Sequence, residues 1–286
     1  MIPKLLQQEV EREIGEGIEF SSMLSGGSIN SVAKVKVKGE AFVLKWNKAT
    51  LYSMFEVEEK GLHLLGMYSG ELIIPKVIGL GKTASYSWLM IQYIPEHSHS
   101  SASFDAFGRA LATMHRNTSA EYGLDHDNYI GSLAQKNDFQ KKWIEFFRAC
   151  RIEPQLSLAI DSGKLSPSIS KQTERLYAKL DSIFPDEPAS LLHGDLWSGN
   201  MFATHNGYTA LIDPAVYYGH REMELAFTRL FGGFSPSFYS GYHEAWPVEP
   251  GFEDRIDLYN LYPLLVHVNL FGGGYIRQVE QILKPF

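Results

Sequence analysis

The chain contains the stretch His193-Gly194-Asp195-Leu196-Trp197-Ser198-Gly199-Asn200, and Leu211-Ile212-Asp213 follows it closely. Between the two segments, Asn206-Gly207 separates two short runs in which apolar residues alternate with others. Asn-Gly in that setting is the strongest short-range signal for a β-hairpin. A hairpin brings its two ends together. We therefore expect Asn200 and Asp213 to lie side by side, with Asp195 a short loop before them.

Two carboxylates and one amide oxygen would then converge on one point. Hard oxygen ligands of this kind suit Mg²⁺, which proteins usually hold with one or two side chains plus substrate phosphates. The spacing Asp-x-x-x-x-Asn also matches the catalytic loop of protein kinases, where the Asp accepts the substrate hydroxyl proton and the Asn holds metal. The alternative is a polar turn with incidental carboxylates. The pattern predicts a phosphotransferase with Asp195 as catalytic residue and Asn200 and Asp213 as metal ligands.

Bulk composition narrows the class of protein. The 286 residues suffice for two lobes, each with its own core. With 26 basic and 33 acidic residues, the net charge of −7 argues against nucleic acid as a partner. No apolar run approaches the length of a bilayer span, and the N-terminus lacks a secretory signal, so no membrane association and a cytoplasmic location are expected. The one cysteine, Cys150, excludes an intramolecular disulfide and is expected to be buried.

The periodicity of apolar residues changes along the chain and predicts an α+β fold. Residues 24–46 read as strands, 50–68 as an amphipathic helix, and 73–79 and 87–94 as two more strands. Beyond a boundary after residue 94 the chain is mainly helical, with one helix over 171–183 and tail helices from 252 that break at Pro263 and at 272–274. We therefore predict two lobes, 1–94 and 95–286. The first is a small antiparallel sheet with one main helix that binds nucleotide, and the second is larger and mainly helical.

Lys45 is the most informative residue of the first lobe. It stands inside an apolar strand, and a buried ammonium needs an anionic partner. Glu58 is the expected partner because it is the one charged residue on an apolar helix stripe, although the adjacent Glu59 competes with it. The pair corresponds to the lysine and glutamate with which kinases position nucleotide phosphates. A lysine that snorkels to solvent from a strand edge is the alternative.

Two further segments are candidates for the nucleotide site. Gly26, Gly27 and Ser28 lie at the head of the first strand, where glycines let backbone amides approach phosphate oxygens. Neither a Walker pattern nor a Rossmann glycine pattern is present. Gln92 and Ile94 end the last strand before the boundary, where a bilobal kinase offers backbone groups to adenine.

Differences from protein kinases point to small-molecule kinases. The loop reads His-Gly-Asp instead of His-Arg-Asp, Asp213-Pro214-Ala215 replaces Asp-Phe-Gly, and no Ala-Pro-Glu segment follows. The chain resembles the aminoglycoside-phosphotransferase type of kinase and, nearly end to end, the fructosamine kinase (ketosamine kinase) family. The segments that carry the resemblance are 26–29, 55–65, 111–116, 127–131, 143–147, 151–156, 193–200, 213–222 and 269–275.

This resemblance implies an enzyme that uses ATP and Mg²⁺ to phosphorylate a sugar hydroxyl of a ketosamine, a small-molecule or protein-bound glycation adduct, as a step of deglycation repair. By the same resemblance, His267 and Asn269 lie in a tail segment that faces the acceptor, although a histidine on an apolar helix is often a core residue. Trp197 is expected either to offer a flat face to the sugar or its amine or to pack under the loop. His193 is expected to pin the loop by hydrogen bonds, and Arg221 and Glu222 to order the metal loop.

The chain departs from the family pattern at three places, and two other functions are alternatives. Glu224 replaces a frequent Asp and is expected to brace the catalytic loop, Ser28 stands where some relatives carry Cys, and residues 133–137 differ from the usual Thr-Pro-Gln-x-Asn. The alternatives are a kinase of another acceptor, such as an aminoglycoside, choline or homoserine, and a non-catalytic nucleotide-binding pseudokinase. The histidines of His97-Ser98-His99 could form a metal pair, but solvated side chains are the simpler interpretation.

Overall fold

The computed structural model describes residues 1–24 and 29–286, which divide into two compact units. The sheet unit comprises residues 1–103 and 199–214, and the helical unit comprises 104–198 and 215–286. The hairpin that carries Asn200 and Asp213 thus belongs to the sheet unit, although it is distant from it in sequence. No helix among the described residues has the length and apolar character needed to cross a membrane.

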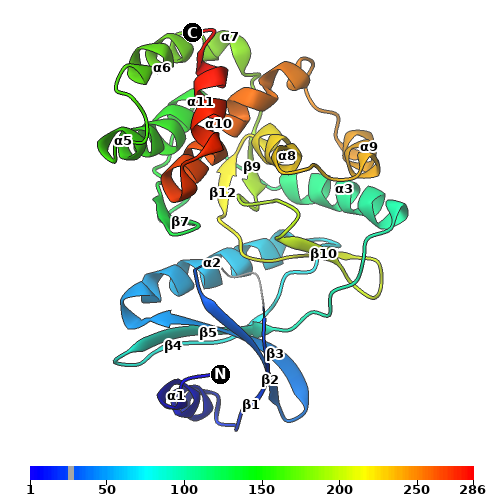
Figure 1. Cartoon of the computed structure of the whole chain (residues 1–286). Coiled ribbons are helices and arrows are strands. Elements are labelled where there is room, and N and C mark those ends of the chain that lie inside the picture. The colour runs from blue at the N-terminus through cyan, green and yellow to red at the C-terminus, as the bar shows by residue number, and fades with distance from the viewer. Residues whose placement is uncertain (25–28) are drawn as a thin grey trace. The chain divides into compact units, whose positions relative to one another are not determined.

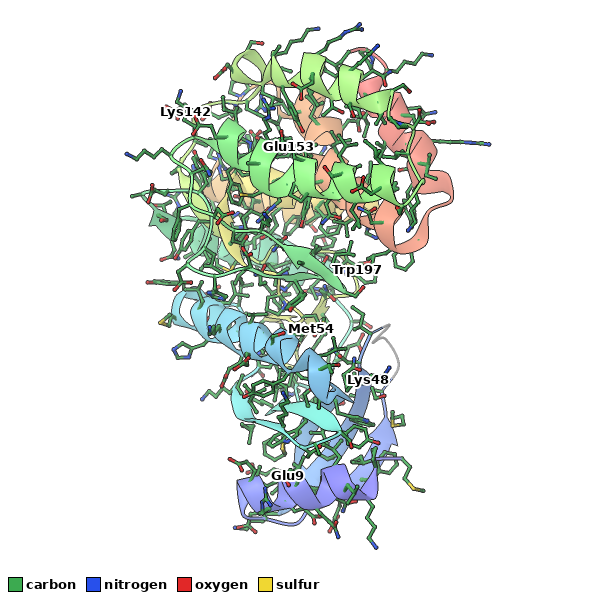
Figure 2. All side chains as sticks on the ribbon, turned by 90° about the vertical axis from the view of Figure 1, so that its left-hand side faces the viewer. Glu9, Lys48, Met54, Lys142, Glu153 and Trp197 are labelled. Carbon is green, nitrogen blue, oxygen red and sulfur yellow. The ribbon has the colours of Figure 1, made fainter. Side chains whose placement is uncertain are left out.

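The sheet unit is built on one antiparallel sheet with the strand order β1-β2-β3-β5-β4. Its strands are β1 (Glu19–Met23), β2 (Ser31–Val37), β3 (Glu40–Lys48), β4 (Val77–Lys82) and β5 (Tyr86–Gln92). The helices α1 (Lys4–Ile14) and α2 (Tyr52–Tyr68) cover opposite faces of this sheet (Figure 1). Figure 2 labels Glu9 on α1 and Met54 on α2. A short 3₁₀ turn (Ala49–Leu51) leads from β3 into α2.

The alternation of side chains along β3 decides what each face of the sheet contacts. Leu44 and Trp46 belong to a buried cluster with Leu6 and Val10 of α1. Successive side chains of a strand point to opposite faces, so Lys45, between them, points toward α2. The four-residue spacing of Leu6 and Val10 was the signal for α1, a helix that the sequence analysis missed.

The predicted hairpin is confirmed as β10 (Met201–Ala203) and β11 (Thr209–Leu211), with Met201 opposite Leu211. Gly207 in its turn adopts φ +79°, which glycine accepts without strain. Ile73 binds this hairpin through the bonds Ile73 N to Thr209 O (2.9 Å) and Leu211 N to Ile73 O (3.0 Å). The strand predicted over 73–79 therefore begins only at Val77, because Ile73 bridges to β11 instead of joining the main sheet.

The helical unit surrounds a three-stranded antiparallel sheet with the order β12-β9-β6. Its strands are β6 (Thr118–Ser119), β9 (Ala189–Leu192) and β12 (Tyr217–Gly219), and β7 (Asn128–Ile130) and β8 (Leu133–Gln135) form a separate hairpin. Its helices are α3 (Ser101–His115), α4 (Trp143–Phe146), a π-helical turn (Phe147–Ile152), α5 (Glu153–Asp161), α6 (Ile169–Tyr177), α7 (Leu180–Ile183), α8 (Arg221–Leu230), α9 (Pro236–Ala245), α10 (Phe252–Phe271) and α11 (Gly274–Leu283).

Two helix predictions were wrong in detail. The helix predicted over 171–183 is two helices, α6 and α7, and Lys179 (φ −108°, ψ −9°) lies between them. The break predicted at Pro263 does not occur, and α10 runs through it. A proline removes one backbone hydrogen bond, and the residues on both sides of Pro263, Tyr262 and Leu264, are buried and hold the helix together.

Candidate active site

In the sheet unit, one buried lysine binds two carboxylates. The Nζ atom of Lys45 lies 2.5 Å from Oε1 of Glu58 and also contacts Oδ1 of Asp213. Lys45 is only 6% exposed, so the snorkelling alternative does not describe it. The partner on α2 is Glu58, whereas Glu59 lines a separate groove. The structure therefore joins three of the predicted site residues: one from β3, one from α2 and one from the loop after β11.

Electrostatics keep this lysine charged. Burial by itself lowers the pKa of Lys45, but the charges of Asp213 and Glu58 and their hydrogen bonds outweigh it, and the net shift is upward. The ammonium is therefore permanently present at neutral pH. A strand lysine paired with a helix glutamate, as Lys45 is with Glu58, is the arrangement with which kinases position a cation on nucleotide phosphates.

The two predicted metal ligands lie at adjoining ends of the hairpin. The amide of Ile212 donates to the carbonyl of Asn200 (3.0 Å), which ties the chain before Asp213 to Asn200. Asp213 itself has φ +55°, a left-handed conformation that is uncommon for a residue other than glycine and often marks functional sites. Its carboxylate is about half exposed, whereas Asn200 is buried. No group of three or more His, Cys, Asp or Glu in the described part of the chain could hold a metal by itself.

Of the other residues predicted to contact the nucleotide, only Gln92 and Ile94 belong to the described part of the chain. Gly26, Gly27 and Ser28 lie outside the described residues. β5 ends at Gln92, and the amide of Gln92 donates to the carbonyl of Lys76 (2.8 Å). Ile94 follows the strand and is half-buried. The backbone contact of these two residues with adenine stays a prediction.

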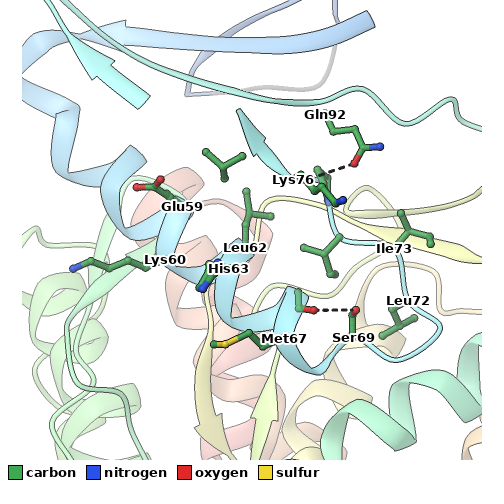
Figure 3. A pocket seen from close by; sticks show the side chains of 14 residues that line it. Glu59, Lys60, Leu62, His63, Met67, Ser69, Leu72, Ile73, Lys76 and Gln92 are labelled. Atoms are coloured by element: carbon green, nitrogen blue, oxygen red, sulfur yellow. Dashed lines mark hydrogen bonds between the residues drawn. The ribbon is translucent and has the colours of Figure 1, made fainter. Parts of the chain in front are cut away.

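The sheet unit also contains a groove of about 950 Å³ (Figure 3). Residues of α2, of the segment 69–77 and Gln92 line it. Leu62, Leu72 and Pro75 are its buried apolar members, and Lys60, His63 and Lys76 are exposed polar ones. Neither Lys45 nor Glu58 belongs to its lining, so this groove is separate from the ion-paired lysine.

In the helical unit, Glu224 holds the backbone of the catalytic loop. Its Oε1 accepts from the amide of Gly194 (2.7 Å), and its Oε2 accepts from the amide of His193 (3.2 Å) and lies 2.8 Å from Nε2 of His115. The amide of Asp195 in turn donates a hydrogen bond to Nδ1 of His193 (3.3 Å). The predicted roles of Glu224 as a brace and of His193 as a loop anchor therefore agree with these bonds.

The Glu224 carboxylate is buried yet ionised. Burial raises its pKa, but the hydrogen bond from His115, the charges of both histidines and the amide of Gly194 lower it further, and the net shift is downward. Gly194 adopts φ +84°, and a Cβ there would lie 2.0 Å from the carbonyl oxygen of Ala215. Only glycine fits, so the loop approaches the segment after Asp213 closely. The amide of Ala215 completes this approach by donating to the carbonyl of His193 (2.9 Å).

A second support of that segment was not predicted from the sequence. On the β7–β8 hairpin, Gln135 donates to the carbonyl of Ala215 (3.0 Å), and Asn128 donates to the carbonyl of Val216 (2.8 Å). Tyr262 of α10 donates to Oε1 of Gln135 (2.6 Å). All three side chains are buried. The family departure noted at 133–137 is confined to Leu133 and Ala134, directly before Gln135, which matches the family pattern and supports the chain after Asp213. The signal available in the sequence was amide residues within short apolar strands.

Arg221 and Glu222 form buried ion pairs at the start of α8. Nη2 of Arg221 lies 2.6 Å from Glu187, and Oε1 of Glu222 lies 2.6 Å from Nη2 of Arg255. These ion pairs hold α8, the helix that carries Glu224. The prediction was that Arg221 and Glu222 would order the loop of the metal ligands directly. Cys150 is buried, as expected.

The three residues predicted to face the acceptor have different surroundings. Trp197 lies two residues after Asp195 in the loop and is 39% exposed. His267 is half-buried and contacts other aromatic rings. Asn269 is buried, and its amide nitrogen donates to the carbonyl and side chain of Gln155 (2.8 and 2.9 Å). That nitrogen is therefore engaged within the protein.

Comparisons with known proteins agree with this site. A family model for fructosamine kinase matches residues 2–286. A probable ketoamine kinase of Enterococcus faecium is 37% identical over 265 residues, which cover 91% of this chain and 93% of the relative. The chloroplastic protein-ribulosamine 3-kinase of Oryza sativa subsp. japonica is 39% identical, with 93% of this chain and 78% of the relative covered.

Solved structures extend the comparison to the fold. A structure from Thermobifida fusca, provisionally assigned as a fructosamine-3-kinase, has a TM-score of 0.88 at 30% identity and covers 98% of this chain and 97% of its own. Aminoglycoside phosphotransferase APH(4)-Ia has a TM-score of 0.65 at 17% identity, with 98% of each chain covered, and so shares the fold. The α+β kinase-like fold is confirmed. The chain belongs to the fructosamine kinase family and is a kinase.

Proposed function

We propose that this kinase transfers the γ-phosphoryl group of ATP to a sugar hydroxyl of a ketosamine, with Asp195 as the residue that orients the hydroxyl and accepts its proton. Phosphoryl transfer is mostly positioning and electrostatic stabilisation, so an aspartate held in place suffices. The observation that carries the proposal is the anchored loop: two backbone amides beside Asp195 bind one buried carboxylate, that of Glu224.

We assign the phosphates of the nucleotide to Lys45, whose ammonium is held by Glu58 and Asp213. Asn200 and Asp213 offer an amide oxygen and a carboxylate, the hard donors that fit a Mg²⁺ ion completed by phosphate oxygens and water. When bound, Mg²⁺ would neutralise charge on the β- and γ-phosphates. Because Asp213 is shared between Lys45 and the proposed metal site, both cations would act on the same end of the nucleotide.

The substrate assignment concerns the acceptor. We propose that Trp197 offers its exposed ring to the sugar or to its amine. We also propose that ketosamines formed from ribose or glucose, that is ribulosamines or fructosamines, are the substrates. Phosphorylation would destabilise the adduct and free the amine, which is the deglycation step that the family resemblance implies. A cytoplasmic location is part of the same proposal, and fractionation of the native host would test it.

The test is Mg²⁺-dependent ATP consumption with ribulosyl-lysine, fructosyl-lysine, an aminoglycoside and choline. We expect turnover on at least one ketosamine, loss of turnover without Mg²⁺, and loss of turnover in Asp195→Asn with ATP binding retained. Turnover only on the aminoglycoside or choline would overturn the acceptor assignment. ATP binding without turnover on any acceptor would favour the pseudokinase alternative. Full activity of Asp195→Asn would remove that residue from the chemistry.

A further inference from the structure

Arg151 is a buried cation that no carboxylate accompanies. It lies in the π-helical turn between α4 and α5, and its side chain is inaccessible to solvent. The ion pairs of the described residues do not include it. Two other buried arginines, Arg221 and Arg255, each pair with a buried glutamate. Burial of a charge without such a partner is costly, and π-helical turns and costly arrangements of this kind are frequent at functional sites.

Three aromatic rings surround the guanidinium in place of a carboxylate. Its central carbon lies 3.8 Å from the ring centroid of Tyr217, 4.5 Å from that of Phe146 and 5.3 Å from that of Tyr262. All three rings are buried, and aromatic faces attract cations most strongly where water is excluded. The rings therefore offset part of the cost of burial. The N–H donors lie in the plane of the guanidinium and bind separate acceptors.

The donors of Arg151 hold the chain directly after β8. Nη1 donates to the carbonyl of Lys136 (2.5 Å), and Nη2 donates to Oδ1 of Asn137 (2.9 Å). Nη1 also donates to the carbonyl of Cys150 in its own turn (3.0 Å). The guanidinium thus ties the π-helical turn to the end of the β7–β8 hairpin with two differently placed nitrogens.

Asn137 is the first of three buried amide side chains that are joined by hydrogen bonds, the amide series: Asn137, Asn128 and Gln135. Because an arginine can only donate, Oδ1 of Asn137 faces Arg151. Nδ2 of Asn137 then donates to Oδ1 of Asn128 (3.0 Å) and to the carbonyl of His126 (3.1 Å). Arg151 is therefore the donor at the start of the series.

The amide series ends at the segment that contacts the catalytic loop. Nδ2 of Asn128 donates to the carbonyl of Val216 (2.8 Å). Gln135 donates to the same Oδ1 of Asn128 (2.8 Å) and to the carbonyl of Ala215 (3.0 Å). The amide of Ala215 donates to the carbonyl of His193 (2.9 Å), within the loop that carries the proposed catalytic aspartate. A continuous set of hydrogen bonds therefore joins Arg151 to that loop within the helical unit.

Tyr262 is a second link between Arg151 and the loop. Its hydroxyl donates to Oε1 of Gln135 (2.6 Å). Burial raises the pKa of this hydroxyl, the charge of Arg151 lowers it, and the charges of Tyr217 and Asp195 raise it. The hydroxyl therefore lies within electrostatic reach of both the buried cation and the Asp195 carboxylate. A displaced guanidinium would alter the hydrogen bonds and the electric field at the same place.

We propose that Arg151 is a positioning residue for phosphoryl transfer. By donating to Asn137, it fixes the amide series and, through the series, the loop of Asp195. The proposal rests on the proposed function, because it concerns the residue that we assign to the acceptor hydroxyl. It requires the forked donors of the guanidinium and not only a positive charge, since one nitrogen must bind Lys136 while another binds Asn137.

The experiment removes the fork and keeps the charge. Arg151→Lys retains a cation among the rings but has one nitrogen in place of three. Arg148→Lys is the matched control, because Arg148 lies in the same turn, 4.5 Å from the ring centroid of Tyr177, and binds Glu153 (2.6 Å) outside the amide series. Leu176→Ala, which truncates a buried side chain of α6, controls for a loss of stability alone.

Three quantities would be measured for each variant: steady-state kinetics with ATP and ribulosyl-lysine, the Tm, and amide hydrogen exchange over residues 193–219. We expect Arg151→Lys to lower kcat about 10- to 100-fold, because a displacement of about 1 Å in a catalytic group can reduce the rate about 100-fold. KM for ATP should change less than about threefold, and the amides of 193–195 and 215–218 should exchange faster. Arg148→Lys should change none of these quantities, and Leu176→Ala should lower the Tm with kcat unchanged.

The outcomes separate positioning from stability. If Arg151→Lys lowers the Tm but retains kcat and the exchange pattern of Leu176→Ala, Arg151 only stabilises the fold and the proposal is overturned. If Arg151→Lys does not fold, Asn137→Ala, which interrupts the amide series after Arg151, should show the same loss of kcat, and full kcat in that variant would overturn the proposal. Absence of turnover on every ketosamine by the unsubstituted protein would overturn the proposed function, whereas the exchange measurement would still decide whether Arg151 holds the loop.

Discussion

Glu224→Gln is the substitution that most directly tests how the catalytic loop is held. The carboxylate receives three hydrogen-bond contacts: the amides of Gly194 and His193 and the Nε2 atom of His115. A glutamine has one acceptor oxygen in place of two. If that oxygen stays with Gly194, the NH₂ group faces the amide of His193, and two donors then oppose each other.

The magnitude follows from this count. One buried backbone amide left without an acceptor costs about 1–3 kcal/mol, and replacing a charged acceptor by a neutral one weakens the bond that remains. We expect a total loss of about 2–3 kcal/mol in the free energy of unfolding, which for a chain of this size lowers Tm by roughly 4–10 °C. His115 softens the effect, because its imidazole can change tautomer and accept from the new NH₂ group.

The catalytic effect should exceed what stability explains. A displacement of about 1 Å in a catalytic group can reduce the rate about 100-fold, so kcat should fall about 10- to 100-fold at a temperature where the variant is fully folded. KM for ATP should change less than about threefold, because the residues assigned to the phosphates are held by other contacts.

The assay is steady-state kinetics with thermal denaturation of the same preparations, and two variants serve as controls. Glu224→Asp keeps both oxygens and should retain more than a tenth of kcat. Glu244→Gln removes an exposed carboxylate that pairs with Arg109 (3.1 Å) and should change neither quantity. A Glu224→Gln protein with lowered Tm and unchanged kcat would refute the reasoning, since the loop would then not need this brace for catalysis.

Three other predictions concern different parts of the chain. Lys45→Met removes the buried cation between two carboxylates and should lower kcat/KM for ATP about 100- to 1000-fold, as measured by ATP titration. Gly194→Ala should abolish the fold or the activity because its Cβ would meet a backbone carbonyl at 2.0 Å, whereas Gly207→Ala, with a similar φ of +79° and open space around it, should cost only about 1–2 kcal/mol by thermal denaturation. Burial lowers the pKa of His220, and two arginine charges add to the effect. Below about pH 6.5 the unfolded chain therefore binds a proton that the folded chain does not, so the free energy of unfolding should be level above that pH and fall below it by up to about 1.4 kcal/mol per pH unit. Urea unfolding at several pH values should show a flatter profile for His220→Gln.

The sequence predicted the parts of the site that depend on local periodicity. The alternation of β3 places Lys45 on one face of the sheet, and the stripe of α2 places Glu58 toward it. The turn at Asn206-Gly207 then fixes a register that brings Asn200 next to the chain before Asp213. Each of these inferences needs only a period of two, a period of 3.6 or one turn. The pairing of Lys45 with Glu58 rather than Glu59 needed the structure.

Contacts between segments that are far apart in the chain have no corresponding periodicity or turn signal in the sequence. Gln135 and Asn128 support the chain after Asp213 through its backbone carbonyls, which any residue type could offer. Their value depends on how closely two loops approach, and that distance is a product of tertiary packing. The same reason explains why α10 passes through Pro263, where the local rule for proline predicted a break and burial on both sides of the residue outweighed it.

Different kinds of interaction hold the candidate residues of the two units. In the sheet unit, Lys45 is held by opposite charges, and under the proposed function phosphate and metal would replace part of those contacts when a nucleotide binds. In the helical unit, the loop of Asp195 is held by Glu224 through backbone amides, which no substrate can replace. Ligand binding should therefore rearrange the lysine contacts and leave the loop unchanged. Substitutions in the first group should alter KM for ATP together with kcat, and substitutions in the second should alter kcat alone.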